Sequence, residues 1–497
     1  MGKIRKFIIK NDKKVHRILE ILPGTVAYSM ILFLLIGGFV IPTTVAYVVL
    51  AYDVLWLYKS VMMAFAGVVS HLRIQASKKM DWLGEVKFFK DWRRVHHIIL
   101  IVTVNEPLYI LRRAVSSLAK QDFPGEQITV VIATEARAPE GKRNAEILKK
   151  EFEGKFGHFF ITAHKLVAGE IIGKASNENY AGRWVKKELV DKRGMDINYL
   201  TITSCDADHK YHPKHFSYFT YSFLDNPHRY RRFWQAAIQS YNNFWRLPAP
   251  CRVVNTLGSV WNTALLTRTD RLINVANYSA SLKMIDEVGY WDPNVIPEDY
   301  RIFFKCFYKF KGQVEVEPIF LPLHIDAAES TTTWKTFKNQ YEQFKRWAWG
   351  VSDDPYIIKH YFLTPGVSFW SKTIRLVRIV QDHFLWPVNW FFITLGVTLP
   401  SIFNHRFSRT VMGYTLPRLS SAILRFTLLF LVIILIVNAK QRPPRPKWFP
   451  RWRAWLLPLE FILMPVVGFF FNALPGLDAH TRLMLGKYLE YRVTEKV

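Results

Sequence analysis

Apolar residues gather toward both ends of the chain and are mixed with polar residues in the middle. Residues 23–52 contain no charged side chain, and Pro42 divides that stretch in two. Since about 20 apolar residues are enough to cross a bilayer, residues 23–70 are expected to form two membrane helices. The pattern places them near 24–41 and 44–67.

A second apolar region follows residue 370. Residues 384–404 carry no charge and residues 419–439 carry a single one, so residues 373–440 are expected to form two further membrane helices. Residues 454–477 are also apolar but are interrupted by prolines and a glutamate. They fit either a third span in this half of the chain or a re-entrant or interfacial helix. The polar, basic tail of residues 478–497 favours the second interpretation.

Residues 97–333 have the pattern of an α/β domain. Residues 97–104 and 128–133 are continuous apolar runs, as in strands buried on both faces, and residues 108–120 between them have helical spacing. One βαβ unit of this kind implies a parallel-rich sheet, and residues 199–204 form a further buried strand. Ligands of such sheets lie at the carboxyl ends of the strands.

The chain of 497 residues carries 67 Lys and Arg against 40 Asp and Glu, a formal charge of +27. Much of this excess lies in residues 1–22 and 441–453, beside the apolar segments. Positive charge marks the cytoplasmic side of membrane helices. We therefore expect a multi-pass protein of the plasma (inner) membrane, in contact with the lipid bilayer and with its α/β domain in the cytoplasm. Residues 71–96 and 334–372 are expected to lie at the membrane interface.

The sequence does not support nucleic-acid binding or a cysteine-based framework. No nucleic-acid motif is present, so nucleic acid is not expected as a partner. The three cysteines are too far apart in the sequence to suggest a zinc site or a disulfide framework.

Two aspartates follow the strand predicted at residues 199–204. Asp206 and Asp208 are two positions apart, so in an extended chain both carboxylates point to one side. Such a pair can hold Mg²⁺ or Mn²⁺ together with substrate phosphates. A solvated pair of loop acids is the structural alternative. No glycine-rich phosphate loop follows any predicted strand, which favours a cation and basic side chains as the phosphate-binding groups.

Glu298 and Asp299 open a predicted helix. Acids are favoured there by the helix dipole, so a purely structural role at the helix N-terminus is one interpretation. The other is a general base that takes a proton from an attacking hydroxyl group.

Gln343, Arg346 and Trp347 lie on a predicted helix that begins near residue 334. Arg346 can neutralise a leaving diphosphate, and Trp347 offers a flat face on which a sugar ring can stack. An aromatic and basic helix lying on the membrane surface is the alternative, and the two roles are compatible. Lys174 starts another predicted helix, where ordinary surface polarity competes with a role in binding.

The order of these motifs resembles that of the family 2 glycosyltransferases. The motifs are Asn-Glu-Pro at 105–107, Gly-Lys-Ala-x-Asn at 173–177, Asp-x-Asp at 206–208, Glu-Asp at 298–299 and Gln-x-x-Arg-Trp at 343–347. Lying between membrane segments, they are most similar to the membrane-integrated, processive synthases of the cellulose and hyaluronan synthase class. The resemblance covers about residues 97–350. It implies an α/β domain of the GT-A fold flanked by transmembrane helices, two before and two or three after. It also implies a nucleotide-sugar donor, commonly a UDP-sugar, a divalent cation (Mg²⁺ or Mn²⁺), and hexosyl transfer with inversion at the anomeric carbon.

The resemblance also implies roles for individual residues. Asp206 and Asp208 would bind the metal and the donor diphosphate, and Asp299, beside Glu298, would be the catalytic base. Gln343 and Trp347 would hold the acceptor, and Arg346 would hold the diphosphate. The nucleotide site would be lined by Thr103, Glu106, Glu135 and Lys174. Glu135 stands where the family usually has an aspartate, which leaves the identity of the donor open.

The end of the chain resembles the gating-loop motif of cellulose synthases, Phe-x-Val-Thr-x-Lys. The matching residues are Tyr491, Val493, Thr494 and Lys496. In those enzymes the motif lies between membrane spans rather than at the end of the chain. A gating role here requires a cytoplasmic tail, so residues 454–477 must not cross the membrane. A frayed polar tail is the alternative.

Three functions remain open from the sequence. The first is the addition of sugars to a growing glycan at the cytoplasmic face. Extrusion of that polysaccharide is left open, because Asp53 and Arg425 within spans allow a wet path but do not show one, and four or five spans leave open a need for a further membrane subunit. The second is the transfer of a single sugar to a lipid-linked acceptor or glycolipid. The third is a non-catalytic membrane scaffold or transport subunit.

Overall fold

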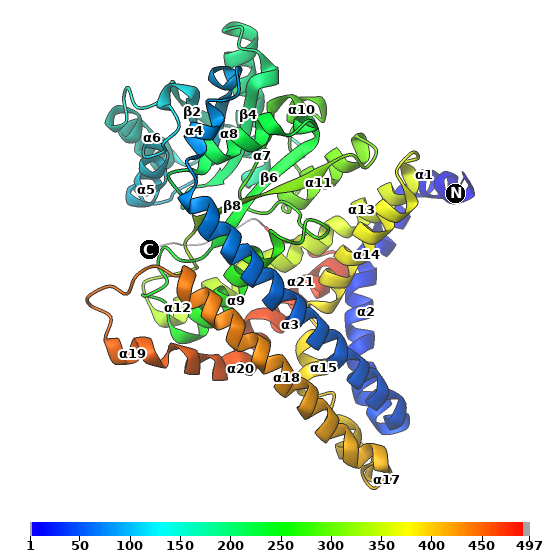
Figure 1. Cartoon of the computed structure of the whole chain (residues 1–497). Helices are drawn as coiled ribbons and strands as arrows, with labels where there is room; N and C mark the ends of the chain where they lie inside the picture. The colour runs from blue at the N-terminus through cyan, green and yellow to red at the C-terminus, as the bar shows by residue number, and fades with distance from the viewer. Residues whose placement is uncertain (1, 491–497) are drawn as a thin grey trace.

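The computed structural model describes residues 2–490 and places an α/β domain at one end of a set of long helices (Figure 1). The N-terminal helices are α1 (Gly2–Lys10), α2 (Asp12–Val40), α3 (Pro42–Lys79) and α4 (Trp82–Val86). The helices after the domain are α12 (Thr333–Ala348), α13 (Asp354–Leu363), α14 (Phe369–Leu385), α15 (Asn389–Thr394), α16 (Leu399–Phe403), α17 (His405–Ser408), α18 (Val411–Gln441), α19 (Arg451–Leu456), α20 (Met464–Gly468) and α21 (Leu474–Met484).

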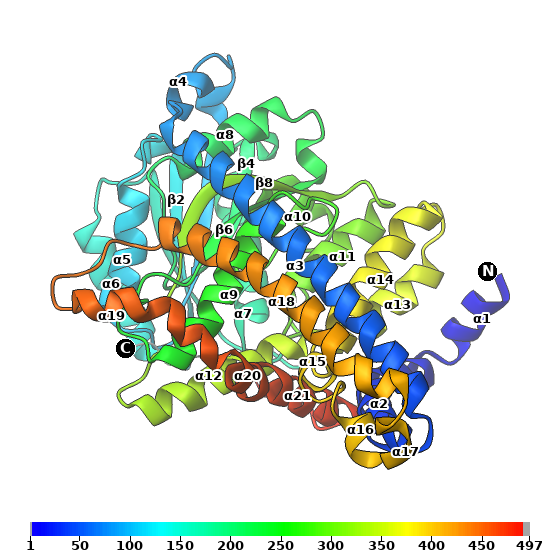
Figure 2. The same cartoon turned by 60° about the horizontal axis from the view of Figure 1, so that its bottom comes forward.

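Four helical runs within the described residues are long and apolar enough to cross a membrane, by length and composition. They are α2, α3, α18 and the stretch Arg451–Met484, which contains α19 to α21. Figure 2 shows α3 and α18 side by side. Between them the fully buried Asp53 accepts a hydrogen bond of 2.5 Å from Ser420 Oγ. The acid within the second apolar segment thus faces a polar side chain of α18.

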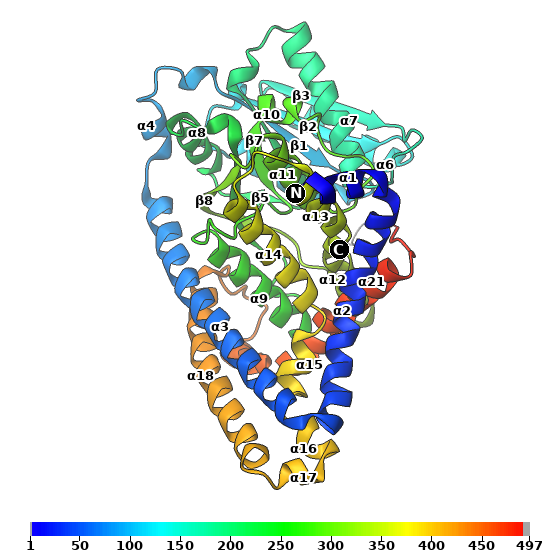
Figure 3. The same ribbon diagram turned by 90° about the vertical axis from the view of Figure 1, so that its right-hand side faces the viewer.

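The uncharged segment 384–404 does not form the single long helix that its composition suggests. It is divided into α15 and α16, next to Pro387 and Pro400, which lack the N–H group that an unbroken helix needs. The segment nevertheless runs from α14 toward the junction of α2 and α3 (Figure 3). At its end Asn404 Nδ2 donates a hydrogen bond of 2.9 Å to Phe39 O, at the end of α2. The broken segment therefore ends beside the C-terminal end of α2.

The strands of the described residues form one eight-stranded sheet in the order β3-β2-β1-β4-β7-β6-β8-β5. Their bounds are β1 (His96–Val102), β2 (Ile128–Glu135), β3 (His158–His164), β4 (Leu200–Asp206), β5 (Lys210–Tyr211), β6 (Arg232–Gln239), β7 (Tyr278–Ser281) and β8 (Glu315–His324). The parallel pairs are β1 with β2, β1 with β4, β2 with β3, and β6 with β8. The antiparallel pairs are β7 with β4, β7 with β6, and β5 with β8. The predicted class, an α/β domain with a parallel-rich sheet flanked by apolar helices, is confirmed.

Helices cover both faces of the sheet. Successive side chains of β1 point into the two cores in turn, which shows why both faces must be covered. Ile98 and Leu100 belong to the core on one face, and Ile99 and Ile101 to the core on the other. The first face is covered by α7 (Lys174–Lys186), α10 (Leu282–Glu287) and α11 (Glu298–Lys309), and the second by α5 (Leu108–Ala119), α6 (Pro139–Glu151) and α8 (His215–Asp225). A strand buried on both faces must be apolar throughout.

The register of the parallel strands brings their carboxyl ends to one edge. Val102 of β1 pairs with Asp206 of β4 on one side and with Ala133 of β2 on the other. The loops after these three strands therefore open at the same place. Helix α9 (Ala249–Leu265) packs against β6 of the sheet and against α3.

Candidate active site

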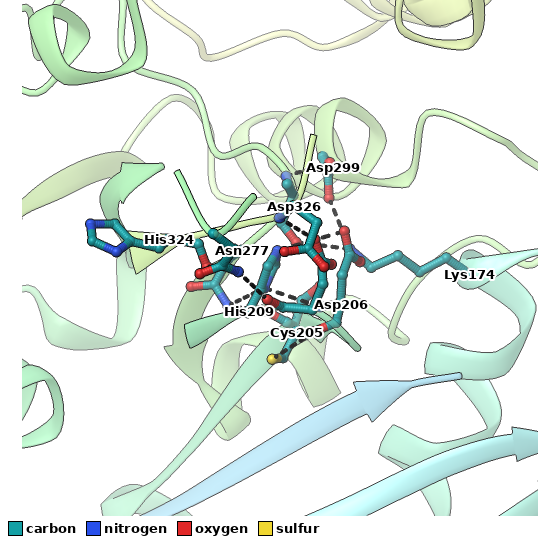
Figure 4. A network of polar contacts seen from close by, with 12 residues as sticks. Lys174, Cys205, Asp206, His209, Asn277, Asp299, His324 and Asp326 are labelled. Carbon is teal, nitrogen blue, oxygen red and sulfur yellow. Dashed lines mark hydrogen bonds and ion pairs between the residues drawn. The ribbon is translucent and has the colours of Figure 1, made fainter. Parts of the chain in front are cut away.

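Acidic groups from two elements meet at the carboxyl edge of the sheet (Figure 4). Asp206 ends β4, and Asp208 follows it within a tight turn. Glu298 and Asp299 form the first turn of α11. Asp206 and Asp299 both lie within 4 Å of the same ammonium group, which belongs to Lys174. Two motifs about 90 residues apart thus belong to one site.

Asp206, Asp208 and His209 form a group that could hold a cation. One ligand atom from each of these residues lies within 4.8 Å of those of the other two. His209 Nδ1 accepts the Asp206 N–H at 3.1 Å, which holds the ring beside Asp206. Asp208 Oδ2 accepts the Asp326 N–H at 2.7 Å. The two carboxylates suit a divalent cation that prefers oxygen ligands.

His209 was not among the residues proposed from the sequence. Its signal is its position directly after the Asp-x-Asp motif, on the tight turn that returns the chain toward Asp206. Sequence reasoning considered only the acids, although histidine is a common metal ligand.

Lys174 lies at the centre of the site rather than on a helix surface. Its Nζ lies 3.0 Å from Asp206 Oδ1 and 3.3 Å from Glu298 Oε1, and it donates to Ala276 O at 2.9 Å. The side chain is 7% exposed. Helix α7 can begin at this place because Gly173 adopts a φ of 151°, in the region that favours glycine.

Glu178, one turn after Lys174, is a second residue that sequence reasoning missed. It is fully buried, accepts a hydrogen bond of 2.5 Å from Ser204 Oγ, and lies 3.9 Å from Lys174 Nζ. Burial raises its pKa to about 7. A sequence signal existed only in the four-residue spacing from Lys174, which is common on helix surfaces.

The acids of α11 differ in their surroundings. Asp299 Oδ2 accepts the Ala276 N–H at 2.7 Å, while Asp299 Oδ1 lies 3.9 Å from Lys174 Nζ. Burial raises the pKa of Asp299. Burial and the neighbouring Asp299 raise the pKa of Glu298 well above its usual range. Of the two, Asp299 is the more readily ionised because a backbone N–H holds its carboxylate.

The structure places the residues expected to line a nucleotide site in separate surroundings. Glu106 Oε2 accepts hydrogen bonds from Thr103 Oγ1 and Val104 N, both at 2.7 Å, so Thr103 and Glu106 close their own loop. Glu135 ends β2 and is held by Arg137 Nε at 2.5 Å. It borders a cavity of about 330 Å³ that is also lined by Lys142 and Arg143 of α6.

The Gln-x-x-Arg-Trp residues lie on α12, where the chain returns toward the long helices. Gln343 is buried and accepts a hydrogen bond of 3.3 Å from Gln340 Nε2. Gln340 in turn accepts one of 2.7 Å from Asn255 of α9. The Trp347 ring is 43% exposed and packs on Phe344, and Arg346 is half-buried. Tyr491, Val493, Thr494 and Lys496 lie outside the described residues.

Comparison with solved structures gives distant likenesses to glycosyltransferases. A mannosyltransferase from Pyrobaculum calidifontis, in complex with GDP-Man and Mn²⁺, is 11% identical over 79% of this chain and 98% of its own, with a TM-score of 0.44. TarS residues 1–349 from S. aureus, in complex with UDP-GlcNAc, are 11% identical over 80% and 93%, with a TM-score of 0.39. No curated protein matches the chain.

The family comparison covers the part of the chain that holds most of the site. Residues 202–439 match the model described as glycosyl transferase family group 2. The matched segment contains Asp206, Asp208, both acids of α11 and the whole of α12. Together with the convergence of these acids on one ammonium group, the match identifies the protein as a glycosyltransferase.

Proposed function

We propose that the protein is an inverting, divalent-cation-dependent membrane glycosyltransferase that builds a polysaccharide from a nucleotide-sugar donor, most simply a UDP-sugar. The observation that carries the proposal is the meeting of Asp206 with Glu298 and Asp299 around Lys174 Nζ. Donor-binding acids and a candidate base on separate elements need a shared counter-charge to lie this close.

Asp206, Asp208 and His209 fit a divalent cation by their atoms and spacing. A cation there would neutralise the diphosphate of the donor as it departs. Arg346, on α12, adds a positive group for the same diphosphate. Lys174 keeps the carboxylates together before the donor binds.

Asp299 is the proposed base. The Ala276 N–H holds its Oδ2, which leaves Oδ1 to take the proton of the acceptor hydroxyl group. Glu298, with the higher pKa, is proposed to stay protonated beside it. This difference in protonation between Asp299 and Glu298 leaves one ionised carboxylate facing the acceptor, as inversion by direct displacement requires.

The membrane arrangement supports a growing glycan as the acceptor. We propose that α2, α3, the broken segment 384–404 and α18 cross the plasma (inner) membrane, with the sheet in the cytoplasm, where nucleotide sugars are made. Helix α12 contacts α21, and α21 contacts α2. The acceptor residues Gln343 and Trp347 are thus next to the membrane helices. A glycan end held there would be close to a path across the bilayer.

Purified protein in nanodiscs tests the proposal. It is supplied with Mg²⁺ or Mn²⁺ and a panel of radiolabelled nucleotide sugars, and label is followed in polymer and lipid fractions. Asp299→Asn should lower turnover by about 10²-fold or more, because it removes the base, while donor binding is retained. Asp225→Asn, at an exposed position, is the matched control and should keep full activity.

Three results would contradict parts of the proposal. Label found only as a single-sugar lipid would reject polysaccharide synthesis. Full activity of Asp299→Asn would reject the assigned base. A folded protein with neither turnover nor donor binding in calorimetry would favour the non-catalytic scaffold.

A further inference from the structure

The stretch Arg451–Met484 is apolar enough to cross a membrane, but its side chains are arranged unlike those of a crossing helix. It is a chain of short pieces: α19, a 3₁₀ segment at Leu457–Leu463, α20, a π segment at Phe469–Ala473, and α21. Prolines lie at three of the four joints, as Pro458, Pro465 and Pro475. In Figure 1, α19 and α20 run across the line of α18 rather than along it.

One face of residues 451–470 is an exposed apolar stripe. Trp452, Trp455 and Ile462 are 64%, 83% and 75% exposed. The stripe, defined as Trp452, Trp455, Leu459, Ile462, Val466 and Phe470, advances by three or four residues at each step and is exposed throughout. Because each step is close to one helical turn, the six side chains lie on one side of the stretch.

The opposite face belongs to the domain. Leu457 packs with Phe449 and with aromatic residues at 241–245, while Val467 and Phe471 pack with Val253 of α9 and Phe344 of α12. Glu460 pairs with Arg252 of α9 through two bonds of 2.8 Å, and Arg252 is only 3% exposed. The middle of the stretch is thus fixed to α9 and to α12, the helix that carries Gln343 and Trp347.

Both ends of the stretch lie on the same side of the long helices. Before it, α18 ends against the sheet, where Gln239 of β6 donates to Gln441 at 2.8 Å. After it, Arg17, before the apolar part of α2, donates to Leu483 O at 2.8 Å. Lys345 of α12 lies 3.2 Å from Asp478 of α21. A stretch that starts and finishes beside the domain does not pass to the other end of the long helices, as a membrane-crossing helix would.

We propose that residues 451–470 form an in-plane membrane-binding helix whose stripe inserts into the cytoplasmic leaflet, next to anionic lipid headgroups. The partner is a bilayer surface because basic residues flank the aromatic end of the stripe and continue directly from the membrane helix α18. Lys447, Arg451 and Arg453 provide that charge, and no acid lies among them. Tryptophans beside basic residues are typical of the interfacial layer.

The inference rests on the membrane placement proposed above and adds two points to it. The chain crosses four times and not five, so residues 478–490 lie on the side of the catalytic domain. The stripe also holds α9 and α12 at the bilayer surface through their contacts with its inner face. The acceptor residues Gln343 and Trp347 would then be kept at a fixed height above the lipid.

Spin labels can measure the depth of the stripe in nanodiscs. Single cysteines are introduced at Trp455, Leu459, Ile462 and Val466, and the native Cys205, Cys251 and Cys306 are buried. Accessibility to oxygen and to a water-soluble nickel complex reports the depth of each label. A label at Leu428, which is 56% exposed on α18, serves as the deep reference.

The in-plane helix predicts equal, shallow depths at all four positions, with Leu428 deeper. A crossing helix would carry the label about 16 Å along the bilayer normal between Trp455 and Val466, at 1.5 Å per residue. Such a depth gradient, with Leu428 still deep, would overturn the in-plane helix but not the proposed membrane placement. Labels shielded from both reagents would show a protein on the stripe instead of lipid. A water-exposed Leu428 would overturn the membrane placement itself.

The proposed contact with anionic headgroups is tested by changing the lipid composition of the nanodiscs. Arg451→Gln with Arg453→Gln should make the Trp455 label shallower in nanodiscs that contain phosphatidylglycerol. The same change should have no effect in pure phosphatidylcholine. An equal response in both lipids would reject the recognition of anionic headgroups.

Discussion

Lys174 carries one positive charge at a place where four carboxyl groups converge. Its neighbours are Asp206, Asp299, Glu298 and Glu178, at 3.0 to 3.9 Å. Carboxylates cannot remain this close in a buried site without a counter-charge, so removing the ammonium group leaves uncompensated negative charge. The acids must then take up protons or lose their positions.

Lys174→Met should therefore destabilise the domain by about 3 kcal/mol near neutral pH. The loss should shrink as pH falls toward 5, because the orphaned carboxyl groups become protonated. Thermal unfolding of the purified protein in detergent, at several pH values, measures both effects. Lys149→Met, at an exposed position of α6, is the matched control and should change stability little. A loss that does not depend on pH would point to packing rather than charge.

Helix α9 connects the sheet to the C-terminal stretch through Arg252. The pair with Glu460 is bidentate and Arg252 is buried, whereas the pair of Arg112 and Glu151 on the domain surface is exposed. Buried charge pairs couple strongly, while exposed pairs contribute little.

A double-mutant cycle should reveal this difference. Arg252→Ala and Glu460→Ala should show a coupling energy of about 1.5 kcal/mol or more. The exposed pair Arg112 and Glu151, at 2.8 Å, should give less than about 1 kcal/mol. Denaturant unfolding of the four variants of each pair supplies the values. Equal coupling in the two pairs would mean that the C-terminal stretch is not firmly attached to α9.

The α/β domain as a whole buries several neutral histidines. Burial lowers the pKa of His96 and His324 to about 4 and that of His215 to about 3, and it lowers that of fully buried His97 well below its usual range. Unfolding would return each of them to a pKa near 6.5. The unfolded chain then binds more protons below that pH, so acid favours unfolding.

The stabilisation that depends on these neutral histidines should therefore be full above pH 6.5 and should be lost as pH decreases toward 4. Each such histidine contributes up to about 1.4 kcal/mol per pH unit in that window. Thermal or denaturant unfolding between pH 7.5 and 5 measures the slope, and His215→Leu should reduce it. A slope that His215→Leu leaves unchanged would contradict the neutral state of this histidine.

Different parts of the structure were predictable to different degrees. The three buried strands recognised from apolar runs are present as β1, β2 and β4, because strands buried on both faces leave a continuous pattern. Strands β3 and β5 to β8 were not identified. Several of them are short or carry polar positions, and their pairing depends on residues far away in the chain.

The sequence by itself determined which residue types could carry the chemistry and where the apolar segments lie. Acids at the ends of strands and helices and apolar runs of membrane length are local properties. The convergence of Asp206 and Asp299 on Lys174, and the addition of His209 and Glu178, required the tertiary structure. So did the direction of residues 451–484, since composition permits crossing while the contacts of both ends favour an in-plane path. Hydropathy measures the free energy of burying a segment in apolar surroundings, but only packing decides whether those surroundings are lipid, protein or the boundary between them.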